Sequence, residues 1–407
     1  MNRTSVLILV LLLAISIQPA LAGTMPGDRD GDSILTREEV AGSILSFLAC
    51  SAGGDCTGAP DEREVTDAVT VYTLWGGVPK QVTDSTGKVR TLTRPLRRVV
   101  VMNGETLETL RSLGVEPSRI VAVERYTGQK PEFFPEFQNT PSVGSIWAPD
   151  YERILSARPD AVFLYATVSA KECDEIEQRI ASANPDITVF RIDCYHPETY
   201  LDDVRILGEI FDRNEESEQL AGFYRDVLDT LAIGLSDPAE PWPAVYFETW
   251  NDYRSAGPGS GYHDKIVLAG GRNIFADSVA DYPDVDPEAV ISRQPGVVVK
   301  IVGTGQYSFG GYSGTNASAF GPTRETLLSR PGWDAIPAVR QGRVYLLHNA
   351  LIGGPQYIIG EAYLAGWFHP GVFSDLDPGG LHRMYISRFQ GLDPSIADPA
   401  RFVFPVP

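Results

Sequence analysis

The 407-residue sequence contains little cysteine, little histidine and few positive charges. It has four cysteines, five histidines and 34 lysines and arginines against 53 aspartates and glutamates, so its formal net charge is −19. This balance argues against nucleic acid as a partner, because nucleic-acid binding requires a basic face. Only His196 precedes residue 200, so a site for a bare zinc or manganese ion is not expected.

Familiar catalytic motifs are also missing. The sequence has no GxSxG, HExxH or phosphate-binding loop. Asp252, Tyr253 and His263 could form an acid–base set, but scattered polar residues of this kind more often contact a ligand. The sequence therefore predicts a binding protein and not an enzyme.

Long apolar runs are absent except at the N-terminus, where Val6 to Ile17 is followed by Ala20-Leu21-Ala22. This pattern predicts a signal peptide over residues 1–22, cleaved after Ala22. The alternative is a retained membrane anchor, for which the run is short. No cysteine stands at the cleavage point, so a lipid anchor is not expected. We expect an exported protein at the periplasmic or extracellular face of the cell membrane.

The four cysteines of an exported chain favour disulfides. Sequence order favours the pairs Cys50–Cys56 and Cys173–Cys194, although four cysteines allow three connectivities and buried free thiols are the alternative. The sequon that begins at Asn316 permits glycosylation.

A calcium-binding pattern follows the signal peptide. Residues 28–39 fit the twelve-residue loop of an EF-hand, with hard oxygen ligands at alternating positions. The expected ligands are Asp28, Asp30, Asp32, the carbonyl of Ile34, Thr36 and Glu39. Two departures are Ser33, where glycine usually makes the turn, and the missing entering helix. The pattern resembles the loop and single helix of dockerin-type repeats, and helices are expected over residues 38–49 and 61–74.

Two segments of the chain, 136 positions apart, read almost the same. Residues 151–162 (YERILSARPDAV) return as residues 287–298 (PEAVISRQPGVV). Each predicts a short helix that opens near a glutamate, ends at proline and leads into a buried strand. The repeat implies two similar α/β lobes, which commonly hold a ligand between them.

The rest of the chain fits this organisation. A hairpin is expected over residues 82–92, and the first lobe over residues 82–200 alternates strands with helices, which predicts a mainly parallel sheet. Apolar residues at helical spacing predict one long helix from Leu201 to Leu235. The predicted modules are a calcium module, a first lobe, a connecting helix and a second lobe with a helical tail, over residues 23–81, 82–200, 201–238 and 239–407.

This order resembles the helical-backbone class of periplasmic substrate-binding proteins, which serve ATP-driven importers of ferric siderophores, haem and cobalamin. The resemblance covers residues 82–368. Its motifs are Val82-Thr83-Asp84 with Gly87, Arg97 to Val101, Val143-Gly144-Ser145, Arg158-Pro159-Asp160, Gly270 to Asn273, Asp286 to Pro295, and Gly332 to Val344. It implies a rigid monomeric binder of two lobes, whose partners are an ABC permease and, through the permease, its ATPase.

In this family a glutamate on each lobe pairs with arginines of the permease, and Glu152 and Glu288 match those positions. One carboxylate on each lobe would allow bidentate recognition at two separate points. The alternative is that both are ordinary glutamates at helix N-termini, where negative charge is favourable.

Candidate ligand contacts follow the predicted strands, because ligands of open α/β sheets bind at the carboxyl ends of strands. Aromatic rings among them suit a large planar or chelate ligand. The candidates are Asn103, Arg125, Tyr126, Trp147 and Tyr165 from the first lobe, and Trp250, Tyr253, Arg254, Tyr262, His263, Tyr307 and Tyr312 from the second.

The cargo stays open among three classes. A ferric siderophore, the cargo expected first, would use Arg125 and Arg254 as counter-charges. Haem would take an axial ligand from Tyr253, Tyr262 or His263. A corrinoid would instead need aromatic walls. A separate possibility, from a different class of function, is a calcium-dependent cell-surface interaction or scaffold protein.

Overall fold

The computed structural model describes residues 25–236, 241–313 and 317–406. The predicted signal peptide over residues 1–22 and the sequon residue Asn316 lie outside the described residues. The chain divides into an N-terminal unit, residues 1–81 with 91–94, and a larger unit, residues 82–90 with 95–407. No helix of the described ranges is long and apolar enough to cross a membrane.

The N-terminal unit contains two helices, α1 (Arg37–Ser51) and α2 (Glu62–Leu74), which pack against each other. Thr36 and Glu39 form a capping box at the start of α1, which satisfies free backbone N–H groups there. The predicted disulfide Cys50–Cys56 is confirmed and closes the loop after α1. Both helices agree with the sequence pattern.

The predicted hairpin is formed by β1 (Lys80–Thr83) and β2 (Val89–Leu92). The N–H of Asp84 donates to the carbonyl of Lys88 at 3.0 Å, and Gly87 takes a positive φ of 80° in the turn. Glycine is suited to this position because it has no Cβ to clash in the left-handed region.

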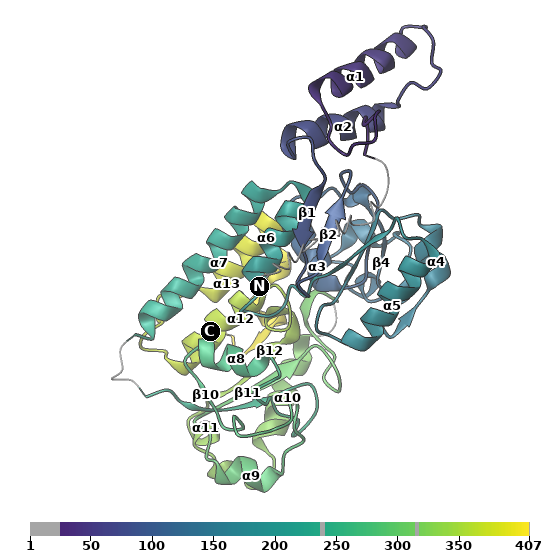
Figure 1. Cartoon of the computed structure of the whole chain (residues 1–407). Coiled ribbons are helices and arrows are strands. Elements are labelled where there is room, and N and C mark those ends of the chain that lie inside the picture. The colour runs from purple at the N-terminus through teal and green to yellow at the C-terminus, as the bar shows by residue number, and fades with distance from the viewer. Residues whose placement is uncertain (1–24, 237–240, 314–316, 407) are drawn as a thin grey trace, which may run out of the picture. The chain divides into compact units, whose positions relative to one another are not determined.

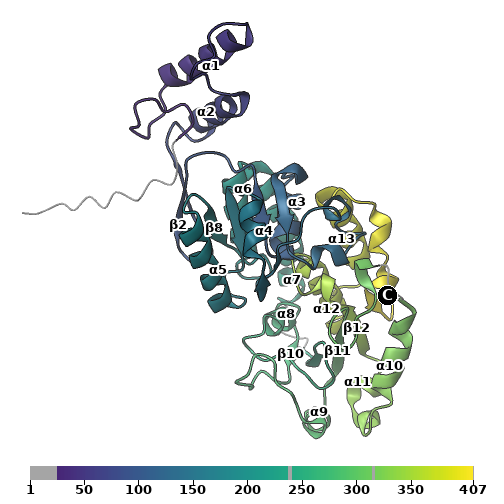
Figure 2. The ribbon, with the colours of Figure 1, turned by 90° about the vertical axis from the view of Figure 1, so that its right-hand side faces the viewer.

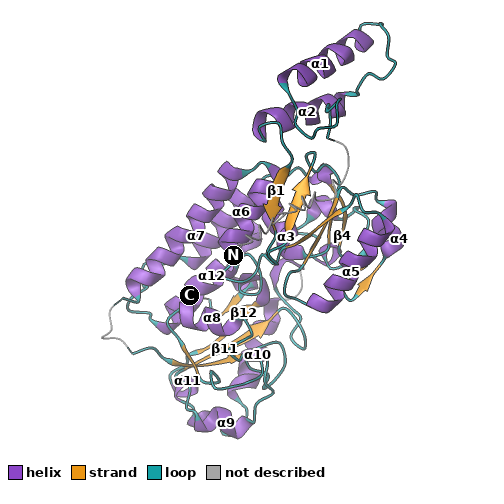
Figure 3. Cartoon of the chain, viewed as in Figure 1, coloured by secondary structure: helices purple, strands orange, loops and turns teal. Residues whose placement is uncertain are grey.

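The first lobe is built on a four-stranded parallel sheet in the order β4-β3-β7-β8. Its strands, drawn in orange in Figure 3, are nearly all buried, so they form continuous apolar runs in the sequence. A small β5–β6 pair lies before α4. The elements are β3 (Val99–Val101), α3 (Gly104–Ser112), β4 (Ile120–Val123), β5 (Gly144–Ser145), β6 (Ala148–Pro149), α4 (Tyr151–Ser156), β7 (Ala161–Leu164), α5 (Ala170–Ala183) and β8 (Thr188–Arg191).

The second lobe repeats this plan with the strand order β10-β9-β11-β12, and an antiparallel fifth strand, β13, follows β12. The two-lobed α/β prediction is confirmed (Figure 1). The elements are β9 (Ala244–Glu248), α8 (Tyr262–Leu268), β10 (Arg272–Asn273), α9 (Pro287–Ser292), β11 (Val297–Val302), α10 (Phe320–Leu328), α11 (Pro337–Arg340), β12 (Val344–His348), α12 (Tyr357–Phe368), α13 (Pro378–Met384) and β13 (Val403–Phe404).

The sequence repeat is also a structural repeat. Helices α4 and α9 are each capped by an aspartate side chain, and each leads into an equivalent central strand, β7 or β11. The residues before the two prolines, Arg158 and Gln294, have nearly the same left-handed backbone, with φ of 46° and 47°. A non-glycine residue rarely adopts this conformation, so the two turns share an unusual detail.

The single connecting helix predicted from Leu201 to Leu235 is wrong. The chain forms two helices, α6 (Tyr200–Phe211) and α7 (Asn214–Gly234), which lie side by side (Figure 1). The break is at Asp212, whose φ of 56° places it in the left-handed region that ends many helices. The apolar pattern that suggested one helix belongs to α7 alone.

The predicted disulfide Cys173–Cys194 is also wrong, because both cysteines are buried free thiols. The Cys173 thiol donates to the carbonyl of Val168, whereas Cys194 lies 3.7 Å from the Thr106 hydroxyl of α3. The two sulfur atoms therefore have partners on different elements. Burial raises the pKa of Cys173 to about 11 and raises that of Cys194, so both stay protonated.

Candidate functional site

The carboxyl ends of the strands of the two lobes meet at a cleft. A pocket of about 50 Å³ lies there, lined by Glu105 and Lys130 from the first lobe and by Asn349 and Gly354 from the second. Helix α3 begins at this pocket, directly after β3. A chelate or tetrapyrrole is larger than this volume, so the pocket can form only the floor of a ligand site.

Aromatic side chains from both lobes lie at this end of the sheets. In the first lobe the Tyr195 ring lies 4.0 Å from the His196 ring and 6.4 Å from the Tyr165 ring, centroid to centroid. In the second lobe the Trp250 and Tyr282 rings are 4.8 Å apart. Such faces offer large contact area at low entropic cost, as a planar ligand requires.

Two carboxylates stand at the first-lobe side of the cleft. The Tyr165 hydroxyl donates to Glu105, and Glu124 lies at the N-terminus of α3, 3.5 Å from the position that a Cβ on Gly104 would take. Burial, and then the neighbouring charge of Glu105, raise the pKa of Glu124 from 4.5 to about 7. This side of the cleft therefore holds an acid that exchanges its proton near neutral pH.

Among the first-lobe candidates, Tyr165 lies in the cleft, while the others have partners within the lobe. Asn103 is buried, caps α3 by accepting from Thr106, and donates to the Ile192 carbonyl. Arg125 stacks over the Tyr126 ring at 4.7 Å. The remaining candidate, Trp147, is 59% exposed, and its indole N–H donates to Ser169.

The second-lobe candidates divide in the same way. Trp250 lies beside Tyr282, and Arg254 pairs with Asp284 at 3.3 Å. The other side chains make contacts within the protein. Tyr262 donates to Asn349, His263 Nδ1 contacts the Asn273 amide, and the buried Tyr312 donates to Gln356 and stacks on Phe133.

Tyr253 and Tyr307 belong to a buried charge network below Trp250. Lys300 contacts Glu248 at 2.9 Å and donates to the carbonyls of Thr249 and Asn251, on either side of Trp250. Burial lowers the pKa of Lys300. The network, completed by Arg330, Asp252, Tyr253 and Tyr307, fixes the loop that carries Trp250.

Sequence reasoning missed five cleft residues: Glu105, Glu124, Tyr195, His196 and Tyr282. Tyr195 and His196 follow β8 closely, so the rule that ligands bind at strand ends would have found them. The predicted disulfide at the adjacent Cys194 instead suggested a structural role for this segment. Glu124 directly precedes the candidate Arg125, and Glu105 is two residues after the candidate Asn103.

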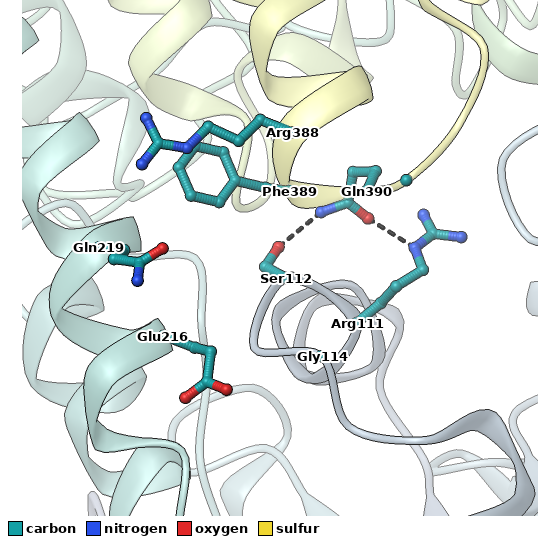
Figure 4. A pocket seen from close by; sticks show the side chains of 9 residues that line it. Arg111, Ser112, Gly114, Glu216, Gln219, Arg388, Phe389 and Gln390 are labelled. Carbon is teal, nitrogen blue, oxygen red and sulfur yellow. Dashed lines mark hydrogen bonds between the residues drawn. The ribbon is translucent and has the colours of Figure 1, made fainter.

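A second pocket, of about 320 Å³, lies at the other end of α3 (Figure 4). Gln390 bridges its wall, since its side chain accepts from Arg111 at 2.7 Å and donates to Ser112 at 2.5 Å. Gln219 and Glu216 of α7 line the opposite side. The C-terminal segment, the first lobe and a connecting helix therefore meet here.

The proposed docking glutamates are placed as the repeat predicts. Glu152 and Glu288 are exposed and stand in the first turns of α4 and α9. Each helix precedes the equivalent central strand of its lobe, so each lobe presents one carboxylate at a matching place.

In the N-terminal unit, one carboxylate oxygen from each of Asp28, Asp30 and Asp32 lies within 4.8 Å of the others. Ser33 adopts the left-handed backbone, with φ of 64°, that glycine usually supplies. Glu39, the predicted twelfth ligand, accepts from the backbone N–H groups of Arg29 and Thr36. Ile34 is exposed, and its N–H donates to Asp32.

Comparison with known proteins agrees with this architecture. A family model described as periplasmic binding protein matches residues 99–351. The chain belongs to this family. It is 26% identical to the vitamin B12-binding protein of Salmonella paratyphi A over 202 residues, which cover 50% of this chain and 71% of that protein.

Two solved structures show the same fold. A TroA-like periplasmic binding protein from Veillonella parvula is 20% identical, with a TM-score of 0.67 over 77% of this chain and 97% of its own. A periplasmic heme-binding protein from Pseudomonas aeruginosa is 23% identical, with a TM-score of 0.52 over 68% and 94% of the two chains. At 20% and 23% identity, the similarity to these two structures shows a shared fold.

Proposed function

We propose that this family member is the extracytoplasmic solute-binding component of an ABC importer, and that it captures a metal chelate or metal tetrapyrrole in the cleft. The aromatic faces of both lobes carry this proposal, above all the Tyr195–His196 and Trp250–Tyr282 pairs. Similarity to a vitamin B12-binding protein and to a heme-binding fold supports it.

Among the three cargo classes, the charges in the cleft favour a corrinoid, or another neutral or cationic complex, over an anionic ferric siderophore. Arg254 is paired with Asp284, which compensates its charge, whereas the exposed Arg125 stacks on the neutral ring of Tyr126 and keeps its positive charge. Glu124 adds negative charge to the cleft above neutral pH. A neutral or cationic complex meets no such repulsion, whereas the two propionates of haem do.

Thermal unfolding of the purified protein tests the cargo. Ferric hydroxamates, ferric catecholates, haem and cobalamin are added separately at fixed calcium. A ligand near 100 times its Kd stabilises the folded state by about 2.7 kcal/mol, which raises the midpoint measurably. A shift with one class identifies the cargo, and no shift with any of them contradicts the proposal.

Glu152 and Glu288 are the proposed contacts with the permease. The exposure of both side chains and the repeated helix–strand unit support this role. The double variant Glu152→Ala with Glu288→Ala should abolish uptake in cells and leave the cargo Kd unchanged. Unimpaired uptake by the double variant would refute the docking role.

We also propose that residues 28–39 bind one calcium ion, with Asp28, Asp30, Asp32, the Ile34 carbonyl, Thr36 and Glu39 as ligands. The convergence of three carboxylates supports this site. Calorimetric titration with calcium tests it, because Asp30→Ala should remove the binding heat.

A further inference from the structure

The pocket at the far end of α3, away from the cleft, has no part in the proposed capture of cargo (Figure 4). Its volume of about 320 Å³ falls within the range of small-molecule sites, roughly 300–1,000 Å³. Three segments that are distant in sequence line this α3–α7 pocket: the end of α3, the first turns of α7 and the segment that follows α13.

Buried side chains fix the inner wall of the α3–α7 pocket. The amide nitrogen of the buried Gln390 donates to Ser112 at 2.5 Å, and its amide oxygen accepts from Nε of Arg111 at 2.7 Å. The Ser112 hydroxyl in turn donates to the carbonyl of Glu108 at 3.1 Å. The buried ring of Phe389 adds an apolar surface to this wall. A ligand therefore meets a preformed wall, which lowers the entropic cost of binding.

The outer wall carries polar groups whose bonding capacity is largely unused. The guanidinium of the exposed Arg388 lies 5.0 Å from the centre of the Phe389 ring, and no residue of the described ranges forms an ion pair with it. The exposed amide of Gln219 has no hydrogen-bond partner in the same part of the chain. Glu216 accepts from Arg213 at 3.2 Å through one carboxylate oxygen, so its second oxygen stays available.

The available groups differ in charge and come from opposite sides of the pocket. Figure 4 shows the Arg388 side chain extending toward the helix that carries Gln219 and Glu216. An anion would be attracted by Arg388 but repelled by Glu216, and a cation would be attracted by Glu216 but repelled by Arg388. A ligand that carries both charges satisfies both groups. An amide between its two charges would also match the amide of Gln219, which can both donate and accept.

We propose that the α3–α7 pocket binds a short zwitterionic peptide of the dipeptide class. The peptide carboxylate pairs with Arg388, its ammonium group with the second oxygen of Glu216, and its amide with Gln219. Side chains of the peptide pack on the Phe389 ring. This site is separate from the cargo cleft, because no residue lines both the α3–α7 pocket and the pocket in the cleft.

Calorimetric titration of the purified protein with millimolar peptide tests the proposal. The three probes are alanyl-alanine, its N-acetyl derivative and its C-terminal amide. Each derivative lacks one of the two charges, so each should bind roughly tenfold more weakly than alanyl-alanine, as the loss of one charged hydrogen bond predicts.

Variants of the pocket assign each charge to its partner. Arg388→Gln should lower the affinity for alanyl-alanine to that for the amide, and Glu216→Gln should lower it to that for the N-acetyl derivative. Gln219→Trp should fill the pocket and remove binding. Glu215→Gln is the matched control, because Glu215 is an exposed carboxylate of α7 that does not line the pocket. Thermal unfolding without peptide checks that every variant folds.

Three outcomes would overturn the proposal. The first is that alanyl-alanine gives no binding heat with wild-type protein. The second is that a blocked derivative binds as tightly as the free peptide, which would remove the need for both charges. The third is wild-type affinity in both Arg388→Gln and Glu216→Gln, which would place the peptide elsewhere on the protein. No cargo takes part in these titrations, so their result does not depend on the proposed function of the cleft.

Discussion

At the scale of single residues, buried charges govern how the larger unit responds to pH. Glu124 is flanked by Glu105, Lys130 and Arg125, and burial outweighs the two cations in raising its pKa. Its folded-state pKa of about 7 exceeds the ordinary 4.5. The folded state therefore binds a proton that the unfolded chain releases between pH 4.5 and 7, so Glu124 costs stability as the pH rises through this window.

Glu124→Gln should remove this cost. We expect the variant to gain about 3 kcal/mol of unfolding free energy over wild type at pH 8 and almost nothing at pH 4. Urea unfolding at the two pH values measures the difference. Glu152→Gln, an exposed change in the same lobe, serves as the control. An equal gain at both pH values would show that the raised pKa is not the cause.

The buried carboxylate of Glu248 is the second charge on which stability depends. It forms ion pairs with both Lys300 and Arg330. Glu248→Gln should destabilise the protein by about 3 kcal/mol or more, since two cations lose their partner. Replacing Lys300 by methionine in the same chain should recover part of this loss. Denaturant unfolding of the single and double variants measures these losses of stability. Purely additive losses would contradict the predicted coupling between Glu248 and Lys300.

At the scale of elements, the C-terminal segment is tied to α3 along its length. Tyr385, which follows α13, and Gln356 donate to the buried Glu108 of α3 (both helices are labelled in Figure 2). Gln390 contacts Arg111 and Ser112 one turn further on (Figure 4). Burial raises the pKa of Glu108. These hydrogen bonds join α3 of the first lobe to the C-terminal part of the second lobe. The two lobes are therefore linked by more than α6 and α7.

Gln390→Ala should loosen this link. The change removes both side-chain hydrogen bonds and leaves buried polar groups without partners, at an expected cost of about 1–3 kcal/mol. Hydrogen exchange should rise in α3 and in the segment after α13. Gln219→Ala is the matched control, because Gln219 lines the same pocket and is exposed. Similar effects of the two variants would rule out a specific role for Gln390.

At the scale of the whole molecule, the N-terminal unit is separate from the unit that holds the cleft. If residues 28–39 bind calcium, a chelator should lower the unfolding temperature of the N-terminal unit and leave cargo affinity unchanged. Ser33→Gly should raise stability by about 1 kcal/mol, because glycine adopts the positive φ without strain. Scanning calorimetry of wild type and Ser33→Gly, with and without chelator, measures both unfolding temperatures. A cargo Kd that changes with calcium would contradict the prediction.

Most of this architecture could be predicted from the sequence, because buried parallel strands and capped helices leave local signals. Strands β3, β4, β7 and β8 alternate with helices, as the pattern over residues 82–200 predicts. The break at Asp212 could not be predicted, since the left-handed residue that ends α6 is an aspartate and not the glycine that usually marks a helix end. Tertiary packing of α6 on α7 decides it.

The site was harder to predict than the fold. Aromatic residues at strand ends stay a prediction as ligand contacts, and Tyr262 and Tyr312 among them donate to partners inside the protein. Whether a side chain turns toward a cleft depends on neighbours that are distant in sequence, as Asn349 and Gln356 show. Cys194 stays a free thiol because it contacts Thr106, a residue distant in sequence, and not Cys173.

The matching turns at Arg158 and Gln294 bear on the history of the molecule. Each places a non-glycine residue in a strained backbone directly before proline, at the start of the equivalent strand. Unrelated sequences would have little reason to arrive at this costly detail twice, with the same strand order around it. The two lobes are most simply explained as copies of one ancestral half, duplicated and fused.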